Sequence, residues 1–200
     1  FHRVSPVRFE LFPVTIHPGY PDFPGEIIEA GYRRIAGDLP WTIVRTRMDR
    51  TIQEKNTPGK YPCAFCARLR RGALYRTAVD RGCNRIALGH HADDAIETVL
   101  ISSMFEGRMV SLPPRFPVEN HPLTVIRPLI RIWEEEIERY SRDHAFPSVS
   151  CGHEDQSGGI RATVKHMLAD IRSRHPDTGR NLLASLQRID PSRFLDSKWL

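Results

Sequence analysis

Short apolar runs alternate along the chain with stretches whose apolar residues recur at helical spacing. Strand-like runs cover residues 9–17, 41–44, 85–89 and 123–126. Helices are predicted over 26–37, 65–80, 93–105 and 132–144, and over a tail from 160 that is broken at His175-Pro176. The polar stretch 49–62 predicts a loop with one helical turn, and the prolines of 113–117 predict another loop. This alternation predicts βαβ units, and therefore an α/β protein with a mostly parallel sheet and helices on both faces.

Length and composition limit the classes of protein to which the chain can belong. The 200 residues are 40% hydrophobic and 26% charged, which predicts one domain with at most a small appendage. The apolar runs are too short to cross a bilayer, and the first residues lack a signal-peptide pattern. We therefore expect a cytoplasmic protein without a membrane partner. The formal net charge of +5 favours a polyanionic partner.

Four cysteines are too few for a disulfide scaffold, and two of them form the pair Cys63-x-x-Cys66 at the predicted start of a helix. Two thiolates in one helical turn can bind the same metal ion or iron–sulfur cluster, and the positive helix end favours the thiolate form. Further ligands are then needed, and Cys151 is the candidate third ligand. A chance pair or a redox dithiol is the alternative. Cys83 is expected to be an inert thiol.

The segment Gly89-His90-His91-Ala92-Asp93-Asp94 follows a predicted strand. Ligands of parallel sheets bind beyond the carboxyl ends of the strands, and a glycine there lets a ligand approach the backbone. Asp93 or Asp94 can position Mg²⁺ bound to phosphates. Either aspartate can equally cap the following helix, since Asp94 and Glu97 have the spacing of a capping box. The spacing leaves both interpretations open.

Arginines dominate the helix that follows the cysteine pair. On a helical period Arg68, Arg71 and Tyr75 share one face, and Arg76 lies next to them in the sequence. Guanidinium groups bind phosphates, and an aromatic ring can stack on an unpaired base. A solvated surface is the alternative explanation of such a charge run. Because Asp80 is the only acid between Cys63 and Arg81, we favour an RNA-binding face.

Two segments together resemble the tRNA 2-thiocytidine synthetase family of the PP-loop ATPase superfamily. They are Cys63-x-x-Cys66-x-Arg68-Leu69-Arg70-Arg71-Gly72-x-Leu74-Tyr75-Arg76 and Leu88-Gly89-His90-His91-x-Asp93-Asp94. The similarity continues through Met104-Phe105, Pro113-Pro114, Ile126-Arg127-Pro128-Leu129, Phe146-Pro147, Cys151 and Gln187-Arg188-Ile189-Asp190-Pro191-Ser192. It therefore covers nearly the whole chain.

The resemblance implies an adenine-nucleotide α-hydrolase-like fold that uses ATP and Mg²⁺, and a 4Fe–4S cluster held by three cysteines. In the family mechanism ATP adenylates the C2 oxygen of a cytidine in the tRNA anticodon loop, sulfur on the cluster attacks C2, and AMP leaves. The implied partners are tRNA, a sulfur donor such as a cysteine desulfurase, and a second copy of the chain. The implied site residues are the cluster ligands Cys63, Cys66 and Cys151, the catalytic Asp93, Asp94 and Arg70, and the nucleotide-binding Gly89, His90, Ile16 and His17.

The chain departs from the family pattern in two places. The family's phosphate loop, Ser-Gly-Gly-x-Asp-Ser, is expected upstream of the strand near residue 14, and Ser157-Gly158-Gly159 does not match it. We therefore expect a segment 1–150 that is an N-terminally truncated PP-loop domain, lacking its first strand and phosphate loop, and a segment 151–200 with a ligand loop and helical tail. Glu154 stands where family members carry a further cysteine.

Two rival functions remain open. One is thiolation of a tRNA uridine, whose enzymes usually carry additional zinc-binding cysteines that this chain lacks. The other is a non-catalytic RNA-binding module in which Cys63, Cys66, Cys151 and His153 hold a structural zinc ion.

Overall fold

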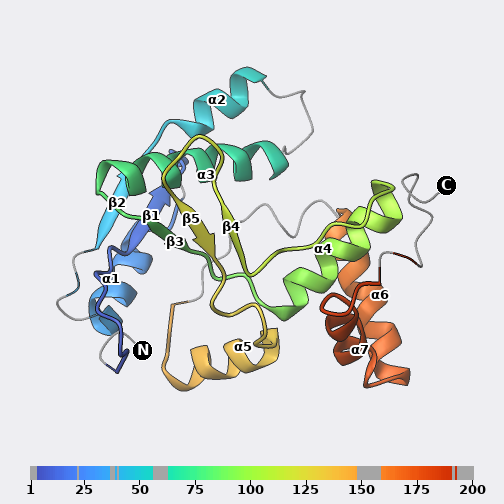
Figure 1. Ribbon diagram of the computed structural model, residues 1–200. Coiled ribbons are helices and arrows are strands. Elements are labelled where there is room, and N and C mark those ends of the chain that lie inside the picture. The colour runs from blue at the N-terminus through green and yellow to red at the C-terminus, as the bar shows by residue number, and fades with distance from the viewer. Residues whose placement is uncertain are drawn as a thin grey trace. The chain divides into compact units, whose positions relative to one another are not determined.

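A computed structural model describes residues 4–21, 23–36, 39, 41–55, 63–147, 159–190 and 192. These residues form an α/β structure that divides into two compact units (Figure 1). Unit 1 comprises residues 1–86, 118–123 and 141–157, and unit 2 comprises 87–117, 124–140 and 158–200. The units interleave along the sequence, whereas the predicted division falls between residues 150 and 151, outside the described residues.

Unit 1 contains a βαβ arrangement. Strand β1 (Val14–His17) pairs in parallel with β2 (Thr42–Arg45), and helix α1 (Gly25–Ala36) connects them. The register places Val14 opposite Thr42 and His17 opposite Arg45. Strand β1 starts five residues later than the run of apolar residues predicts. The parallel pairing and crossover helix agree with the α/β prediction.

The core of unit 1 forms where helices α2 (Met48–Lys55) and α3 (Cys63–Asp80) meet β1. Ile16, Met48 and Ile52 are buried, and Phe65 and Leu69 of α3 pack against them. The stretch 49–62 was predicted to be a loop with one helical turn, but the helical part is longer, since residues 49–55 all lie in α2. Met48 and Ile52 are one helical turn apart, so a single buried stripe makes this otherwise polar segment helical.

A glycine sets the turn after β1. Gly19 has φ of +103°, and a Cβ there would lie 2.2 Å from Oδ1 of Asp49. The backbone conformation and the close approach both require glycine. The turn leads the chain from the carboxyl end of β1 toward α1.

A second, three-stranded sheet has the order β3-β5-β4 (Figure 1). Strands β3 (Arg85–Ala87) and β5 (Thr124–Ile126) lie close to their predicted positions, but β4 (Arg115–Pro117) was expected to be a loop. The pairing of β4 with β5 is antiparallel, so the second sheet is not wholly parallel. Strand β4 lies at the edge of this sheet, where a proline such as Pro117 is tolerated because an edge strand has unpaired N–H positions.

Helices α4 (Ala92–Phe105), α6 (Ile160–Arg174) and α7 (Thr178–Ser185) pack together in unit 2 (Figure 1). Their core contains Ile96, Val164 and Leu168, all buried. The break predicted at His175-Pro176 separates α6 from α7, and α5 (Glu134–Asp143) lies within the range predicted for it. None of the described helices is long and apolar enough to span a bilayer.

The cap of α4 differs from the prediction. His91 is the N-cap, so Asp93 and Asp94 lie inside the first turn rather than before it. Asp94 Oδ2 accepts a hydrogen bond from the backbone N–H of His91 at 3.0 Å. The capping partners are therefore His91 and Asp94, and the box predicted from Asp94 and Glu97 is wrong. Glu97 is buried instead.

Candidate functional site

The loop between β3 and α4 contains Gly89, His90 and His91. Gly89 is exposed, and apart from Gly89 and its two chain neighbours no atom of the described residues lies within 4 Å of the position that a Cβ would take there. The backbone at Gly89 is therefore open to a ligand. The two aspartates of the motif follow at once in the first turn of α4.

His90 is half-buried and is contacted by Arg127, which follows β5. The Nε–H of Arg127 donates a hydrogen bond to Nδ1 of His90 at 3.3 Å. Burial lowers the pKa of His90, and the positive charge of Arg127 lowers that pKa further. The negative charge of Asp94 raises the pKa of His90, but the pKa still stays below its usual value. The imidazole is therefore neutral at pH 7 and has one acceptor and one donor nitrogen.

Asp93 is buried and has two hydrogen-bond donors. The backbone N–H of Glu134 donates to Oδ2 at 2.8 Å, and Nη1 of Arg172 donates to Oδ1 at 2.7 Å. Burial by itself would raise the pKa of Asp93, but these two hydrogen bonds and the charge of Arg172 outweigh it, so the pKa is lowered. Asp93 is therefore an ionised carboxylate that joins the start of α4 to α5 and α6.

Asp94 shares an arginine with Glu97. Nη1 of Arg161 lies 3.0 Å from Oδ1 of Asp94 and 3.0 Å from Oε2 of Glu97. Burial raises the pKa of Glu97, and the charge of Arg161 opposes this. A carboxylate offers about four lone-pair positions. Asp93 and Asp94 therefore keep capacity for a metal ion beside their protein partners, and their role as Mg²⁺ ligands stays a prediction.

The cysteine pair occupies the first turn of α3. Cys66 is half-buried against the core of unit 1, and Nη2 of Arg70 lies 4.0 Å from its Sγ. The Cys63 side chain, Cys151 and His153 lie outside the described part of the structure. Within that part, no three Cys, His, Asp or Glu side chains come together as a metal site.

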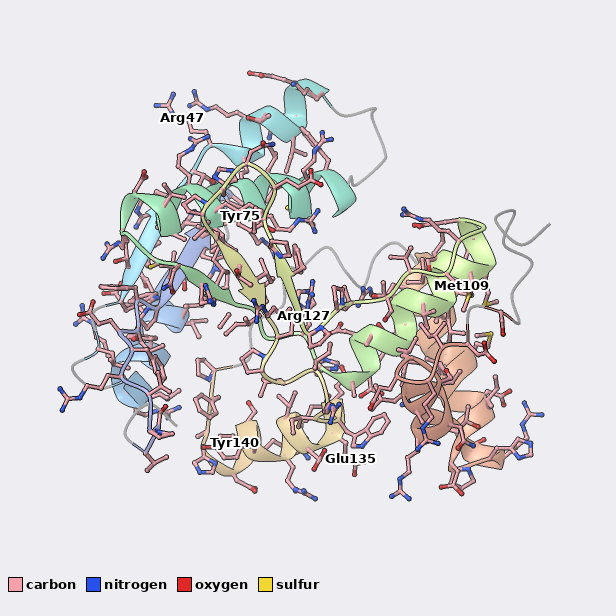
Figure 2. All side chains as sticks on the ribbon, in the orientation of Figure 1. Arg47, Tyr75, Met109, Arg127, Glu135 and Tyr140 are labelled. Atoms are coloured by element: carbon pink, nitrogen blue, oxygen red, sulfur yellow. The ribbon has the colours of Figure 1, made fainter. Side chains whose placement is uncertain are left out.

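Several arginines of α3 are exposed. Arg68, Arg71 and Arg76 are exposed, and the guanidinium of Arg68 lies over the Phe65 ring at 5.1 Å. Tyr75 is half-buried, and its ring centroid lies 6.2 Å from that of His121 (Figure 2). The face predicted from the helical period is therefore present, although Tyr75 already has an aromatic neighbour.

The two nucleotide-binding residues predicted on β1 have different surroundings. Ile16 is 7% exposed and belongs to the core of unit 1, so only its backbone is left for a ligand. His17 Nδ1 accepts a hydrogen bond from the N–H of Gly19 at 3.0 Å, and its ring contacts Phe23. Both residues lie in unit 1, as Arg70 does, whereas Gly89, His90, Asp93 and Asp94 lie in unit 2.

The sequence did not reveal the arginines that contact the motif of α4. Arg127, Arg161 and Arg172 contact His90, Asp94 and Asp93 respectively. Arg127 belongs to the segment Ile126-Arg127-Pro128-Leu129, which carried part of the family resemblance and was the available signal. Arg161 and Arg172 lie on α6 among several arginines, so nothing in the local pattern distinguishes them.

Comparisons with known proteins support the family resemblance. No family model matches the chain. A tRNA-cytidine(32) 2-sulfurtransferase of Geobacter sulfurreducens is 39% identical over 199 residues, covering 97% of this chain and 76% of the relative. The enzyme of that name from Syntrophotalea carbinolica is 35% identical over 202 aligned residues, covering 98% of this chain and 75% of the relative.

A solved structure shares the fold. The U34-tRNA thiolase NcsA from Methanococcus maripaludis, solved with its 4Fe–4S cluster, matches with a TM-score of 0.71 at 20% identity. The match covers 94% of this chain and 66% of that chain. The likeness confirms the PP-loop fold, and the sequence identities confirm the family resemblance. The chain belongs to the tRNA-cytidine(32) 2-sulfurtransferase family.

Proposed function

We propose that the protein is an ATP-dependent tRNA sulfurtransferase that replaces O2 of a cytidine in the anticodon loop with sulfur. The observation that carries this proposal is an identity of 35 to 39% with relatives of that name, over at least 97% of the chain. This extent of identity favours cytidine over uridine as the substrate. The 20% identity to the uridine thiolase supports the fold alone.

The first part of the proposed site is a 4Fe–4S cluster bound by Cys63, Cys66 and Cys151. Residues three apart in a helix lie on the same side of it, so the first turn of α3 suits two ligands of one cluster. The 4.0 Å contact between Nη2 of Arg70 and Sγ of Cys66 places a positive charge beside one of the two ligands. When bound, the cluster supplies a place to hold the sulfur atom.

The second part is a nucleotide site that uses Gly89, His90, Asp93 and Asp94 of unit 2. The family resemblance also implies nucleotide contacts of Ile16 and His17 and a catalytic role of Arg70, which belong to unit 1. In the proposed first step O2 of cytidine attacks the α-phosphate of ATP, and pyrophosphate leaves. Asp93 and Asp94 would hold Mg²⁺, which would supply positive charge to neutralise that leaving group. The C2–O bond then breaks with AMP as the leaving group when sulfur attacks C2, so a poor leaving group has become a good one.

The third part is a tRNA-binding face on α3. Arg68, Arg71 and Arg76 are exposed and suit backbone phosphates, and Tyr75 lies on the same helix. Each turnover consumes one sulfur atom, so a sulfur donor such as a cysteine desulfurase must act with the enzyme. We also propose a cytoplasmic location, where tRNA and thiols are available, and a homodimer, which light scattering of the purified protein tests.

Nucleoside analysis tests the substrate. The gene is expressed in a bacterial strain that lacks its own tRNA cytidine thiolase, and digested tRNA is examined by mass spectrometry. We expect 2-thiocytidine to appear. Appearance of 2-thiouridine alone would replace cytidine with uridine as the substrate, and no thionucleoside would count against the enzyme.

Metal analysis tests the cluster with a matched pair of cysteine variants. Anaerobically purified protein should contain about four irons per chain and a broad visible absorption. Cys66→Ser should lose the iron, whereas Cys83→Ser, a half-buried cysteine in the same unit, should retain it. One zinc ion per chain and no iron would support the RNA-binding module with a structural Cys₃His site instead.

A further inference from the structure

Arg127 is held firmly where β5 ends, beside the loop that follows β3. The N–H of Leu88 donates to the carbonyl oxygen of Ile126 at 3.0 Å, which brings the two chain segments together. Arg127 is 7% exposed, its N–H donates to the Pro114 carbonyl oxygen at 2.8 Å, and its guanidinium lies 5.0 Å from the Phe116 ring centroid. Nη1 also donates to the carbonyl oxygen of Pro113. These contacts fix the guanidinium rather than leave it to rotate (Figure 2).

The fixed guanidinium dictates which nitrogen of His90 carries the proton. Arginine can only donate hydrogen bonds, so the Nδ1 atom that accepts from Nε–H of Arg127 must hold a lone pair. In a neutral imidazole the proton then resides on Nε2. Among the described residues Nε2 of His90 has no hydrogen-bond partner, and it is not a buried atom. It is therefore a donor that is left for a ligand.

We propose that Arg127 is a positioning residue that fixes His90 in the Nε2–H tautomer, so that His90 offers a hydrogen-bond donor to an oxygen of the bound nucleotide. The nucleotide in this statement rests on the proposed function, whereas the tautomer does not. A hydrogen bond to one ring nitrogen sets both the tautomer and the orientation of a histidine ring. A phosphate or ribose oxygen accepts such a bond. The neutral Nδ1–H tautomer would present a lone pair at Nε2 and could not donate it.

Imidazole nitrogen-15 spectra of the purified protein test the tautomer without any ligand. Near pH 8 we expect His90 to show a lone-pair nitrogen at Nδ1 and a protonated nitrogen at Nε2, with no second form. Arg127→Met, which keeps an apolar stem beside Phe116, should give a tautomer mixture, and Arg127→Lys should restore part of the preference. Arg131→Met, an exposed arginine in the same unit, is the control. An Nδ1–H form in the unmodified protein, or an unchanged ratio in Arg127→Met, would overturn the proposal.

A pair of His90 variants tests the donor with Mg·ATP as the probe. The side-chain NH₂ of glutamine can reach the position of Nε2, whereas that of asparagine reaches only the position of Nδ1. His90→Gln should therefore bind Mg·ATP more tightly than His90→Asn, which should lose about 5- to 10-fold in affinity, the usual effect of one hydrogen bond. If Arg127→Met does not fold, this pair of variants still tests the donor role of His90.

The two readouts separate failures of the proposal and of the proposed function. Equal or tighter binding by His90→Asn overturns the donor role. No binding of Mg·ATP to the unmodified intact protein, together with the expected tautomer, overturns the nucleotide and with it the proposed reaction. In that case the assignment of Arg127 as the residue that fixes the tautomer stands on the spectra.

Discussion

The carboxylate of Asp93 lies in the Gly-His-His-x-Asp-Asp segment that carried the family resemblance. The contacts that the structure shows for it are with other residues of unit 2. It accepts hydrogen bonds from Glu134 and Arg172, and its side chain is 7% exposed. A buried charge whose partners satisfy it is costly to disrupt, since the partner then remains buried and unpaired. Asp93 therefore has a role in stability whether or not it also binds Mg²⁺.

Replacing Asp93 with asparagine should reduce the free energy of unfolding by about 2–4 kcal/mol, because the Arg172 guanidinium loses its ionic partner. Asp170→Asn is the control, since the ion pair of Asp170 with Arg174 is 65% exposed and should change stability by less than about 1 kcal/mol. Urea denaturation measures both. Equal effects of the two substitutions would contradict the importance of burial at Asp93.

The same residue predicts a pH dependence. Folding lowers the pKa of Asp93. The stability that its ionised carboxylate contributes is therefore fully present above the pKa of the unfolded chain, about 4. That stability is lost as the pH falls through the lower pKa of the folded state. The stability difference between the unmodified protein and Asp93→Asn should therefore be constant from pH 5 to 7 and shrink below about pH 4. Urea midpoints measured across this range check it. A difference that grows on acidification would contradict the lowered pKa.

Helices α6 and α7 are joined by a close approach between an arginine and a glycine. A Cβ on Gly179 would lie 2.9 Å from Nη2 and 3.0 Å from Nε of Arg172. Both nitrogens are buried without a hydrogen-bond partner in the described part of the chain, and the guanidinium lies 5.6 Å from the Trp133 ring centroid. The guanidinium is thus held by Asp93 and also lies close to the backbone of α7, so a side chain at Gly179 would displace it.

Gly179→Ala should lower stability by about 1–2 kcal/mol, because the added methyl group pushes Arg172 away from Asp93. The cost should be smaller in the background of Asp93→Asn, where Arg172 is no longer held, so a double-mutant cycle should show coupling. Gly72→Ala on α3 is the matched control. No atom lies within 4 Å of its Cβ position, so it should gain about 0.5–1 kcal/mol of helix stability. Additive effects at Gly179 and Asp93 would contradict the proposed contact.

The exposed arginines of α3 are one concentration of positive charge in unit 1. Binding to a polyanion releases counterions, so each arginine that contacts a phosphate contributes to the salt dependence of the affinity. Arg71 is one of the exposed arginines of α3, whereas Arg34 is an exposed arginine on α1 of the same unit. The two residues therefore allow a local test of where tRNA binds.

Arg71→Gln should weaken binding of a tRNA anticodon stem-loop and reduce the slope of log affinity against log salt by roughly 0.7–0.9, the contribution of one phosphate contact. Arg34→Gln should leave both quantities unchanged. Fluorescence anisotropy over a salt series measures the slopes. An equal loss in the two variants would indicate that the charge of the whole protein, rather than a face of α3, attracts the RNA.

Local spacing was sufficient for much of the fold. Residues that start or stop a helix placed α3, α4 and α6, and the break before α7, close to their observed positions, because a capping residue, a glycine or a proline marks these boundaries in the local sequence. The pattern failed at α2, which has only Met48 and Ile52 as buried residues, and at the three-residue strand β4. Short elements are stabilised by what they pack against, so their own sequence contains little of the signal.

The residues of the candidate site were likewise predicted only in part from the sequence. The sequence alone identified the cysteine pair, the Gly-His-His-x-Asp-Asp segment and the family, since these motifs are contiguous in the chain. The tertiary structure added the partners Arg127, Arg161 and Arg172, which lie 37 to 79 positions away from the residues they contact. No local rule selects one arginine among many at such separations. Only folding brings a particular guanidinium to a particular imidazole or carboxylate, and that contact sets its protonation and orientation.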